Sequence, residues 1–591
     1  MKKHVAPTLL CLFSVVTFSQ VLPADRSVDW SLAGIHEFPA IETHLNFVDE
    51  GGVGDGTTSN SAVISTLLSD YAGDTVAIFF PSGAFFFDSQ ISLPNNFTLY
   101  GNGADSTTLI FDLDGESLDL IRITGSAGTE TATVLAGITK DEHTCTVDDA
   151  TDFEAGDWVQ LIDEDSDWVT STWSLGKTGQ ILRIADITEG VITFDSPFRR
   201  DYVLANAPYI NRLNMKHHVA VTDLKIVRQD ATDGQTNTIG MRYAQNCYVG
   251  CIESEMTNFA HVKLEFSSNC EVSGSYFHDG FDYGSGGKAY GVVCQFATGE
   301  CLIQNNSFEH LRHSMLLQAG ANGNVYAYNY SIDPYWTDVA LPENAAGDMV
   351  LHGNYVYANL FEGNIVQNIV IDNSHGINGP YNTFFRNRAD LYGIFMNSAP
   401  ASNSQNFIGN EITNSGFLLG MYVLEGTDHF EYGNNHQGEV IPEGTTDLSD
   451  QSYYLDEGPI YYTSQDIWPP IGYPNELDAN QNQASENYAE GYPVFCLSPP
   501  YVDDSGIEQE TKAKLLVYPN PINELIYITY MGGDYAAQNI AIYNEVGELV
   551  HQQKLMGNTT PIHTEHLSSG VYIVKLISEK DNSVETKFIK L

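Results

Sequence analysis

One unit recurs along the middle of the chain, from Met215 to about Glu425. Each copy is a short apolar strand, a polar step with Asn or Gly, a second strand and then Asn or Ser, as in VKLEFSSNCEVSGSYF and SMLLQAGANGNVYAYNYS. A unit of ~20–35 residues cannot bury its apolar face without a neighbour, so the copies must stack. Short β-branched strands, corners of Asn and Gly, and no helical periodicity predict a right-handed parallel β-helix.

Length and charge limit the other possibilities. The 591 residues exceed one ordinary globular core, so we expect two or three domains. Lys and Arg number 26 against 76 Asp and Glu, which gives a net charge of -50. Nucleic acids need many Lys and Arg contacts to phosphate, which this chain lacks. We therefore expect a soluble monomer that does not bind nucleic acid.

Residues 1–19, MKKHVAPTLLCLFSVVTFS, carry two lysines, an apolar run and then small residues. This order is typical of a signal peptide, with cleavage expected near Ser19–Gln20. No other stretch of the sequence is apolar and long enough to span a membrane. The mature chain is predicted to be secreted.

The cysteines follow the repeat. Cys247, Cys270 and Cys301 fall at the same point of successive copies, where stacked coils would bury them. Cys247 and Cys251 have the spacing of half a zinc site, but no matching second pair follows. We predict buried packing residues, with a disulfide as the alternative.

Residues 46–110 contain NFVDEGGVGDGTTSNSAVISTLL, AIFFPSGAFFFDSQISL and FTLYGNGADSTTLIFD, in that order. As a set these motifs resemble the opening module of the pectate-lyase-like superfamily of β-helix proteins. The resemblance implies a short helix at residues 60–69 that caps the coil. It also implies that Asp55 forms a turn and has no catalytic role.

Residues 126–205 alternate apolar and polar residues at period two, which predicts an antiparallel β excursion inserted between coils. One interpretation is that its aromatic and basic residues form a wall of a saccharide cleft. The alternative is a small hydrophobic core with solvated arginines. The residues concerned are Trp158, Trp168, Trp173, Arg199 and Arg200.

The β-helix domain is expected to span residues 20–502, and its aperiodic tail, residues 441–502, to lie along the solenoid and close its far end. A linker follows at 503–513. Residues 514–591 contain LLVYPNPINELIYITY, IAIYNEVGELVHQQ, LSSGVYIVKL and TKFIKL. These motifs closely resemble the C-terminal sorting domain of the type IX secretion system, a small β-sandwich. The resemblance implies recognition by that machinery, with release or attachment at the cell surface.

Alternate residues of a strand face opposite sides, so the repeats can be aligned on their Asn or Gly step. The alignment predicts these inward side chains: Val262, Leu264, Phe266, Val292, Cys294, Phe296, Met315, Leu317 and Ala319. It predicts these outward side chains, stacked on one face: Arg242, His261, Lys263, Glu265, Gln295, Arg312 and Gln318. His313 adjoins them.

This face holds much of the scarce positive charge of the chain. A strongly acidic protein that gathers cations on one face is predicted to receive an anionic substrate there. The alternative is a solvated face whose charges pair with one another, such as Lys263 with Glu265. The chemistry predicted for an anionic polysaccharide that contains uronate is β-elimination.

β-Elimination needs a cation or Ca²⁺ to neutralise the substrate carboxylate, a base to remove the C5 proton and an acid to protonate the leaving oxygen. Lys263 is the predicted base, because the nearby cations Arg242 and Arg312 would favour its neutral amine. Arg312 or His313 is predicted to bind the carboxylate or to steady the leaving group, and His261 is a further candidate.

Two more sets complete the predicted site. Ca²⁺, as a possible cofactor, would be held through oxygen ligands by Glu265, Asp279 and Asp282. Substrate contacts are predicted for Arg242, Gln295, Gln318, Lys288, Tyr335 and Trp336. The corner motifs HGN at 352–354 and DNSHGING at 372–379 are read as structural turns, and the alternative is that His375, with Arg386 and Arg388, extends the cleft.

VKLEFSSNCEVSGSYF and HLRHSMLLQAGANGNVYAYNYS resemble the lysine strand and the Arg-His strand of the β-helix alginate lyases and chondroitinase B. The resemblance implies Lys263 and Arg312 as the catalytic pair beside a bound Ca²⁺. Here a whole coil, GVVCQFATGECLIQNNSF, intervenes. Either the pair bridges two rungs, about 10 Å, or Lys288 or His261 takes a part.

Two other functions stay open. A glycoside hydrolase would use two carboxylates, from Glu265 with Asp279, Asp282 or Glu309. The Asp pair and Gly-His-Gly of the β-helix polygalacturonases are missing from the sequence. The other alternative is a polysaccharide-binding solenoid or adhesin at the cell surface, without catalysis.

Overall fold

The computed structural model describes two compact units, Met1–Asp503 and Asp504–Leu591. In the first it describes residues 20–337, 341–397, 399–459, 461–462, 468–472 and 481–495. In the second it describes residues 514–518, 525–531, 539–544, 547–554, 559–564, 566–577 and 584–590. The predicted signal peptide, the linker at 503–513 and Cys496 lie outside these residues.

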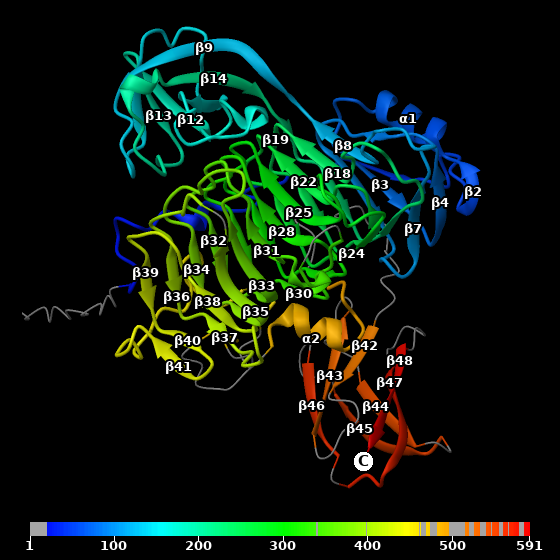
Figure 1. Cartoon of the computed structure of the whole chain (residues 1–591). Helices are drawn as coiled ribbons and strands as arrows, with labels where there is room; N and C mark the ends of the chain where they lie inside the picture. The colour runs from blue at the N-terminus through cyan, green and yellow to red at the C-terminus, as the bar shows by residue number, and fades with distance from the viewer. Residues whose placement is uncertain are drawn as a thin grey trace, which may run out of the picture. The chain divides into compact units, whose positions relative to one another are not determined.

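The first unit is the parallel β-helix that the repeats predicted (Figure 1). Each coil contributes three strands in turn, and each strand pairs in parallel with its counterpart one coil further on. The first ladder is a 12-stranded sheet. Its strands are β1 (Thr43–Asn46), β3 (Val76–Phe80), β6 (Phe97–Gly101), β16 (Ala220–Thr222), β20 (Tyr248–Gly250), β23 (Glu271–Ser273), β26 (Leu302–Gln304), β29 (Val325–Ala327), β32 (Leu360–Glu362), β34 (Thr383–Phe385), β36 (Asn406–Ile408) and β39 (Phe430–Tyr432).

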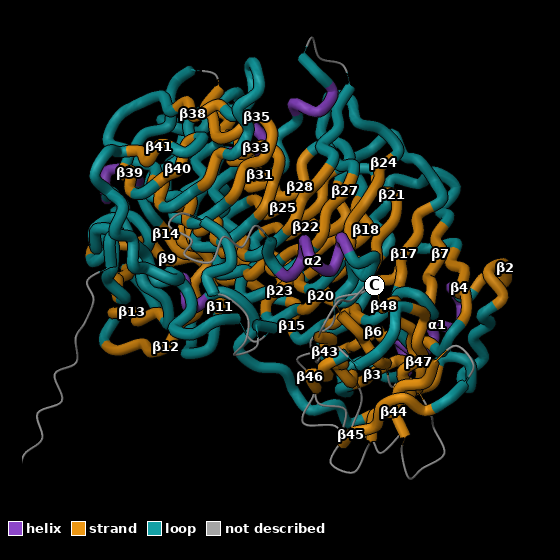
Figure 2. The backbone as a smooth tube through the Cα atoms, turned by 90° about the horizontal axis from the view of Figure 1, so that it is seen from below, coloured by secondary structure: helices purple, strands orange, loops and turns teal. Residues whose placement is uncertain are grey.

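The other two ladders join in one 21-stranded sheet. The second ladder comprises β2 (Asp55–Ser59), β4 (Gly83–Phe87), β7 (Thr107–Phe111), β17 (Lys225–Arg228), β21 (Glu253–Thr257), β24 (Tyr276–Gly280), β27 (Ser307–Glu309), β30 (Tyr330–Ile332), β33 (Ile365–Asp372), β35 (Arg388–Asn397), β37 (Glu411–Ile412) and β40 (Asn434–His436). The third, whose strands lie side by side in Figure 2, comprises β5 (Ile91–Ser92), β8 (Ile121–Thr124), β18 (Asn237–Arg242), β22 (Ala260–Glu265), β25 (Tyr290–Gln295), β28 (His313–Leu317), β31 (Met349–Leu351), the later halves of β33 and β35, and β38 (Met421–Val423).

The interior of the coil is apolar, as alternation predicts. Val262, Leu264, Val292, Met315 and Leu317 all lie in one continuous core. Cys247, Cys270 and Cys301 are free, buried and stacked in the same core, which confirms the packing interpretation. Asn side chains form a ladder through one corner, in which each amide donates to the next at 2.9–3.1 Å: Asn306, Asn329, Asn364, Asn387, Asn410 and Asn434.

The prediction that Phe266, Phe296 and Ala319 point inward is wrong. Each ends its strand with a left-handed backbone, at φ of 49°, 56° and 51°. This conformation ends the alternation of the strand, and the side chains pack in a cluster outside the coil. Tyr243, at φ 50°, stacks on Phe266 in the same way, with ring centroids 4.8 Å apart.

The inserted excursion is a closed antiparallel barrel with strand order β10-β13-β12-β11-β14-β9. Its strands are β9 (Ser126–Ala136), β10 (Thr144–Val147), β11 (Trp158–Ile162), β12 (Gln180–Thr188), β13 (Val191–Phe194) and β14 (Tyr209–Asn214). The barrel reaches Asn214, beyond the expected 205, because β14 closes it by pairing with both β9 and β11.

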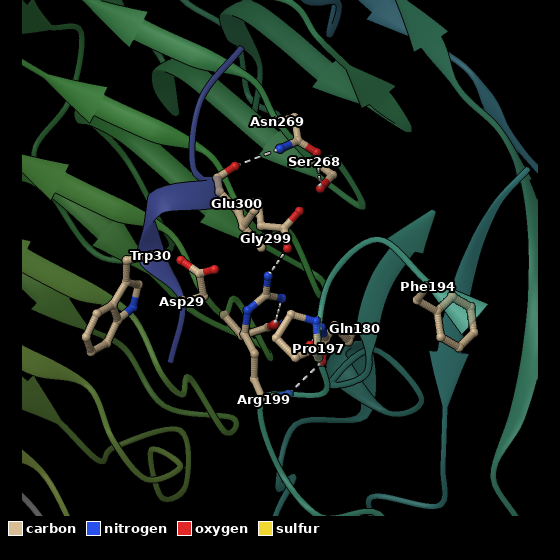
Figure 3. A network of polar contacts seen from close by, with 12 residues as sticks. Asp29, Trp30, Gln180, Phe194, Pro197, Arg199, Ser268, Asn269, Gly299 and Glu300 are labelled. Atoms are coloured by element: carbon tan, nitrogen blue, oxygen red, sulfur yellow. Dashed lines mark hydrogen bonds and ion pairs between the residues drawn. The ribbon is translucent and has the colours of Figure 1, made fainter. Parts of the chain in front are cut away.

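Two buried arginines stabilise this barrel and its contact with the solenoid. Figure 3 shows the first of them, Arg199, beside Glu300. Arg199 pairs with Glu300 and donates to Asn322 Oδ1 at 2.8 Å, both on a solenoid corner. Arg200 pairs with Asp163 at 2.7 Å. Both side chains are almost fully buried, so the arginines are neither a cleft wall nor solvated.

Short elements and the tail complete the first unit. The helix α1 (Ser61–Asp70) lies where the cap was expected and buries Ile64, Leu67 and Leu68 in the core. The tail packs Tyr453, Tyr454 and Tyr461 outside the 12-stranded sheet. Remaining elements are η1 (Trp30–Leu32), η2 (Thr172–Ser174), η3 (Leu204–Asn206), η4 (Glu343–Ala345), α2 (Gln483–Ala489), β15 (Lys216–His217), β19 (Ala244–Gln245) and β41 (Glu439–Ile441). Within the described parts of the chain, helices with the length and apolarity of a membrane span are absent.

The second unit has two antiparallel sheets around one core, as a sandwich requires. One sheet contains β42 (Lys514–Tyr518), β43 (Leu525–Met531) and β46 (Thr559–His563). The other contains β45 (Leu549–Lys554), β44 (Asn539–Asn544), β47 (Gly570–Ile577) and β48 (Val584–Lys590).

Candidate functional site

A cleft of about 910 Å³ follows the outer face of the third ladder. Its described lining runs from Lys263 on β22 to Met421 on β38. This path crosses six steps between neighbouring strands, which is about 29 Å at ~4.8 Å per step. A cleft of that length suits a chain-like ligand better than a small metabolite.

A polar row begins at one end of the cleft. Register places Arg242, Glu265 and Gln295 side by side on β18, β22 and β25. The buried carboxylate of Glu265 lies 3.2 Å from Lys263 Nζ and 3.5 Å from Arg242 Nη1, and accepts from Gln295 Nε2 at 2.5 Å. Gln318 Nε2 donates in turn to Gln295 Oε1. The predicted stack therefore forms, and it includes the Lys263–Glu265 pair.

The same row continues on the next coils with residues that the sequence analysis read as turns. His352 follows Gln318, because Leu317 pairs with Leu351. Its Nδ1 lies 2.5 Å from Asp372 Oδ2. Ser374 donates to the same carboxylate through its backbone N–H and its hydroxyl, at 2.9 and 2.8 Å. Burial opposes the charge on Asp372, but the hydrogen bond and charge of His352 outweigh it and lower the pKa of Asp372 to about 2.

His313 lies beside this pair, with its ring 5.8 Å from that of His352. Its Nδ1 is 2.7 Å from the carbonyl oxygen of Gly347, so Nδ1 carries the proton and Nε2 is the free acceptor. Burial, with the charges of Arg312 and His352, holds the pKa of His313 well below its usual value. His313 is therefore neutral at neutral pH. His375 adds a third imidazole, 4.8 Å from His352.

Arg312 also lines the cleft, with its guanidinium carbon 5.9 Å from the ring centroids of Tyr290 and Trp336. Its Nη1 donates to the carbonyl of Gly284 at 2.5 Å. Its Nε is buried and has no hydrogen-bond partner among the described residues. The residue as a whole lines the cleft, where a planar guanidinium is suited to bind a carboxylate.

His261 is wrongly predicted as an outward residue. The bend between β21 and β22 turns its ring inward, where Nδ1 lies 2.7 Å from Ser254 Oγ and the ring packs on Phe277. Burial and the charge of His278 lower the pKa of His261 to about 3. This imidazole belongs to the interior and not to the cleft.

The residues predicted to hold Ca²⁺ do not come together. Glu265 is occupied by its two cations, Asp279 lies 2.9 Å from His278 Nδ1, and Asp282 pairs with Lys288. Within the described chain, the group of three potential metal ligands that the geometry brings within 4.8 Å is a different one: Glu253, Glu255 and His278. Lys225 already pairs with both of its glutamates, at 2.7 and 2.6 Å. Glu309, a carboxylate considered for hydrolysis, accepts a hydrogen bond from the hydroxyl of Tyr276.

Of the remaining predicted contacts, Gln295, Gln318 and Trp336 line the cleft. Lys288 and Tyr335 lie outside its described lining; Tyr335 instead stacks on His310 at 4.6 Å. Trp173, one of the tryptophans offered as a cleft wall, and His375, offered as an extension of the cleft, do line it, whereas sequence reasoning missed three lining residues: Tyr290, His352 and Asp372. Extending the Gln295–Gln318 row by two coils would have found His352 and Asp372.

Two segments match known families. Residues 44–144 match the family described as rhamnogalacturonase A/epimerase, pectate lyase-like, and residues 516–591 match the secretion system C-terminal sorting domain. The sorting domain indicates type IX secretion, to the extracellular space or the cell surface. A comparison with curated proteins finds no significant match.

Several solved structures resemble this chain at low identity. The tailspike protein gp49 from Pseudomonas phage LKA1 is 12% identical with a TM-score of 0.41, over 66% of this chain and 77% of that one. The exopolygalacturonase from Thermotoga maritima is 13% identical with a TM-score of 0.34, over 69% and 94%. The A-module of the Azotobacter vinelandii mannuronan C-5 epimerase AlgE4 is 11% identical with a TM-score of 0.32, over 67% and 96%. Such low values carry nothing about the activity of this chain.

Proposed function

We propose that this chain, which joins a pectate-lyase-like β-helix to a type IX sorting domain, is a secreted enzyme that cleaves an anionic polysaccharide by β-elimination. The observation that carries the proposal is the charge of the cleft. In a chain with a net charge of -50, the described lining holds Lys263 and Arg312 against two carboxylates, Glu265 and Asp372, so its charges balance while the chain as a whole is strongly acidic. Such a cleft admits a polymer with uronate or sulfate groups, which the acidic remainder of the chain repels.

The central residues can supply the proton transfers. Arg312, whose guanidinium lines the cleft, binds the substrate carboxylate and so acidifies the C5 proton. His352, oriented by Asp372, takes that proton at Nε2. The electron pair of the broken C–H bond forms the new double bond as the C4–O bond breaks. Tyr290 keeps its phenolic proton, because burial raises its pKa, and gives it to the leaving oxygen.

Lys263 is the alternative base, as the sequence predicted. It lies three strand steps from His352, about 14 Å at ~4.8 Å per step. The two therefore serve different positions along a bound polymer. In the proposal Lys263 and Arg242 bind an anionic group on a neighbouring sugar.

Ca²⁺ remains a prediction that the residues around Glu265 do not support, and no step is assigned to it.

The experiment that tests the proposed function is a screen of uronate-containing and sulfated glycans, each with and without chelator. A gain in ultraviolet absorbance from the unsaturated sugar indicates elimination. New reducing ends without that absorbance indicate the hydrolase alternative, and binding without cleavage indicates a binding solenoid.

Variants then locate the centre. His352→Gln is expected to lower turnover by about 10²–10⁴-fold, the range for loss of an acid–base group. Lys263→Ala is expected to raise KM more than it lowers kcat. Full activity in both His352→Gln and Arg312→Ala would reject this assignment. Arg183→Ala, an exposed cation on the barrel, is the control.

A further inference from the structure

One loop of the inserted barrel, residues 163–178 between β11 and β12, lies against successive corners of the solenoid. Asn354 Oδ1 accepts from the backbone N–H of Thr170 and of Ser171, both at 3.3 Å. A Cβ on Gly320 would lie 2.3 Å from the Cα of Thr178, and one on Gly376 would lie 3.0 Å from Thr170 Oγ1. These corners therefore have the shape needed to receive the loop.

The loop is also held internally by one buried carboxylate. Asp165, 1% exposed, accepts from Gly176 N at 3.0 and 2.9 Å and from Thr178 Oγ1 at 3.0 Å. This bridge closes the loop around η2, which carries Trp173. The indole is thus presented by a rigid segment and keeps a defined position.

Trp173 reaches the cleft and stays open to solvent there. Its side chain lines the cleft and is 41% exposed. Its ring lies 5.9 Å from Phe296 and 6.4 Å from His375. Phe296 comes directly after Gln295, the residue that β25 contributes to the polar row. His375 comes shortly after Asp372, the residue that β33 contributes. The coils that carry Gln318 and His352 lie between the coils of Phe296 and His375. The indole, which contacts both of these rings, therefore lies over the part of the row that Gln318 and His352 form.

We propose that Trp173 is a sugar-binding platform over the position next to His352, and that the barrel serves as the wall that sets affinity for the polymer. The C–H face of a pyranose packs on an indole, while its anionic group faces the cations of the sheet. An exposed tryptophan between polar groups is suited to this role and costs little conformational entropy. The inference rests on the proposed polysaccharide function, and it adds the residue that binds the uncharged face of the sugar.

The test measures binding by calorimetry, apart from turnover, with hexasaccharides of polygalacturonate, alginate and chondroitin sulfate in the His352→Gln background of the full chain. Trp173→Ala is expected to weaken binding about tenfold, the value of one stacked ring. Trp173→Phe should recover most of it. Leu175→Ala is the matched control, in the same loop and 43% exposed.

A second pair of variants tests the contact between loop 163–178 and the solenoid corner at Gly320. Gly320→Ala should weaken binding as Trp173→Ala does, although the indole is intact, because the new methyl group displaces the loop. Gly438→Ala is the control. It makes the same substitution at φ 95°, where the new Cβ would have no atom within 4 Å, and it should leave binding unchanged. Thermal unfolding of each variant shows that the fold is retained.

The outcomes separate the two claims. Unchanged binding in Trp173→Ala, with binding lost in Arg312→Ala, overturns the platform and leaves the proposed function standing. Binding lost in Trp173→Ala for a glycan that the enzyme binds but does not cleave supports the platform and contradicts elimination. No binding of any glycan of the panel overturns both.

Discussion

His352 and Asp372 meet across neighbouring coils, with the imidazole Nδ1 2.5 Å from the carboxylate Oδ2. They occupy one outward row because β31 pairs in parallel with the later half of β33. This ion-pair contact holds the ring beside the carboxylate and leaves Nε2 for a ligand, which suits an acid–base group. The pair also couples a candidate proton-transfer residue to the stability of the coil.

We expect Asp372→Asn to lower kcat with little change in KM, because the amide no longer orients and stabilises a charged His352. The folded-state pKa of Asp372 is depressed from 3.8 to about 2. Its contribution to stability is therefore present above about pH 4 and lost as pH falls towards 2, by about 2 kcal/mol in all. Unfolding by denaturant between pH 5 and 2 should show this loss in the wild type and not in the variant. If the wild type and Asp372→Asn lose the same stability between pH 5 and 2, the pairing of Asp372 with His352 is contradicted.

Glu362 gives the opposite pH dependence. It is fully buried beneath the tail and accepts from Tyr328 Oη and Tyr453 N, both at 2.9 Å. Burial raises its pKa from 4.5 to about 7. Stability should therefore fall as pH rises from about 4.5 to 7, by about 3 kcal/mol, and then level off. Glu362→Gln should flatten this segment of the stability curve, and a curve that keeps its slope in the variant would show that another group titrates.

The barrel contact should be sensitive to one buried arginine and insensitive to an exposed one. Arg199→Ala leaves Glu300 buried without its partner, which is expected to cost about 3–5 kcal/mol. Arg183→Ala removes an exposed pair with Asp195 and should cost under about 1 kcal/mol. Denaturant unfolding of both variants measures the contrast. Equal small effects would mean that the Arg199 network does not stabilise the contact.

Much of the fold could be predicted because each coil repeats the same step. The alignment on Asn or Gly placed Arg242, Glu265 and Gln295 in one row, and register confirms it. The same rule failed at Phe266 and at His261. Alternation holds only while the backbone stays extended, and a left-handed residue or a bend between ladders ends it.

The centre of the site was harder to predict, for two reasons. His352 and Asp372 stand next to Gly and Asn corners, and a corner motif alone does not show that a ligand is bound there. Trp173 is a candidate for a cleft wall from the sequence, but it comes from a separate barrel, and its place along the row is set by the contact of its loop with Gly320 in the folded chain. A contact between two elements so distant in sequence produces no motif with a regular spacing, so a single sequence does not reveal it.

Glu265 offers a last test of whether the cleft receives anions. Its carboxylate neutralises Lys263 and Arg242, so Glu265→Gln should leave two cations free for the substrate. We expect the variant to bind anionic hexasaccharides more tightly. Its affinity should fall more steeply between about 50 and 200 mM salt than that of the wild type, because salt screens the two freed cations. The variant should also be less stable by about 1–3 kcal/mol. Calorimetry at two salt concentrations measures the first two, and denaturant unfolding the third. Glu309→Gln, whose parent pairs with Tyr276 outside the cleft, is the control. Affinity and salt dependence that match the wild type would mean that Lys263 and Arg242 do not contact the glycan.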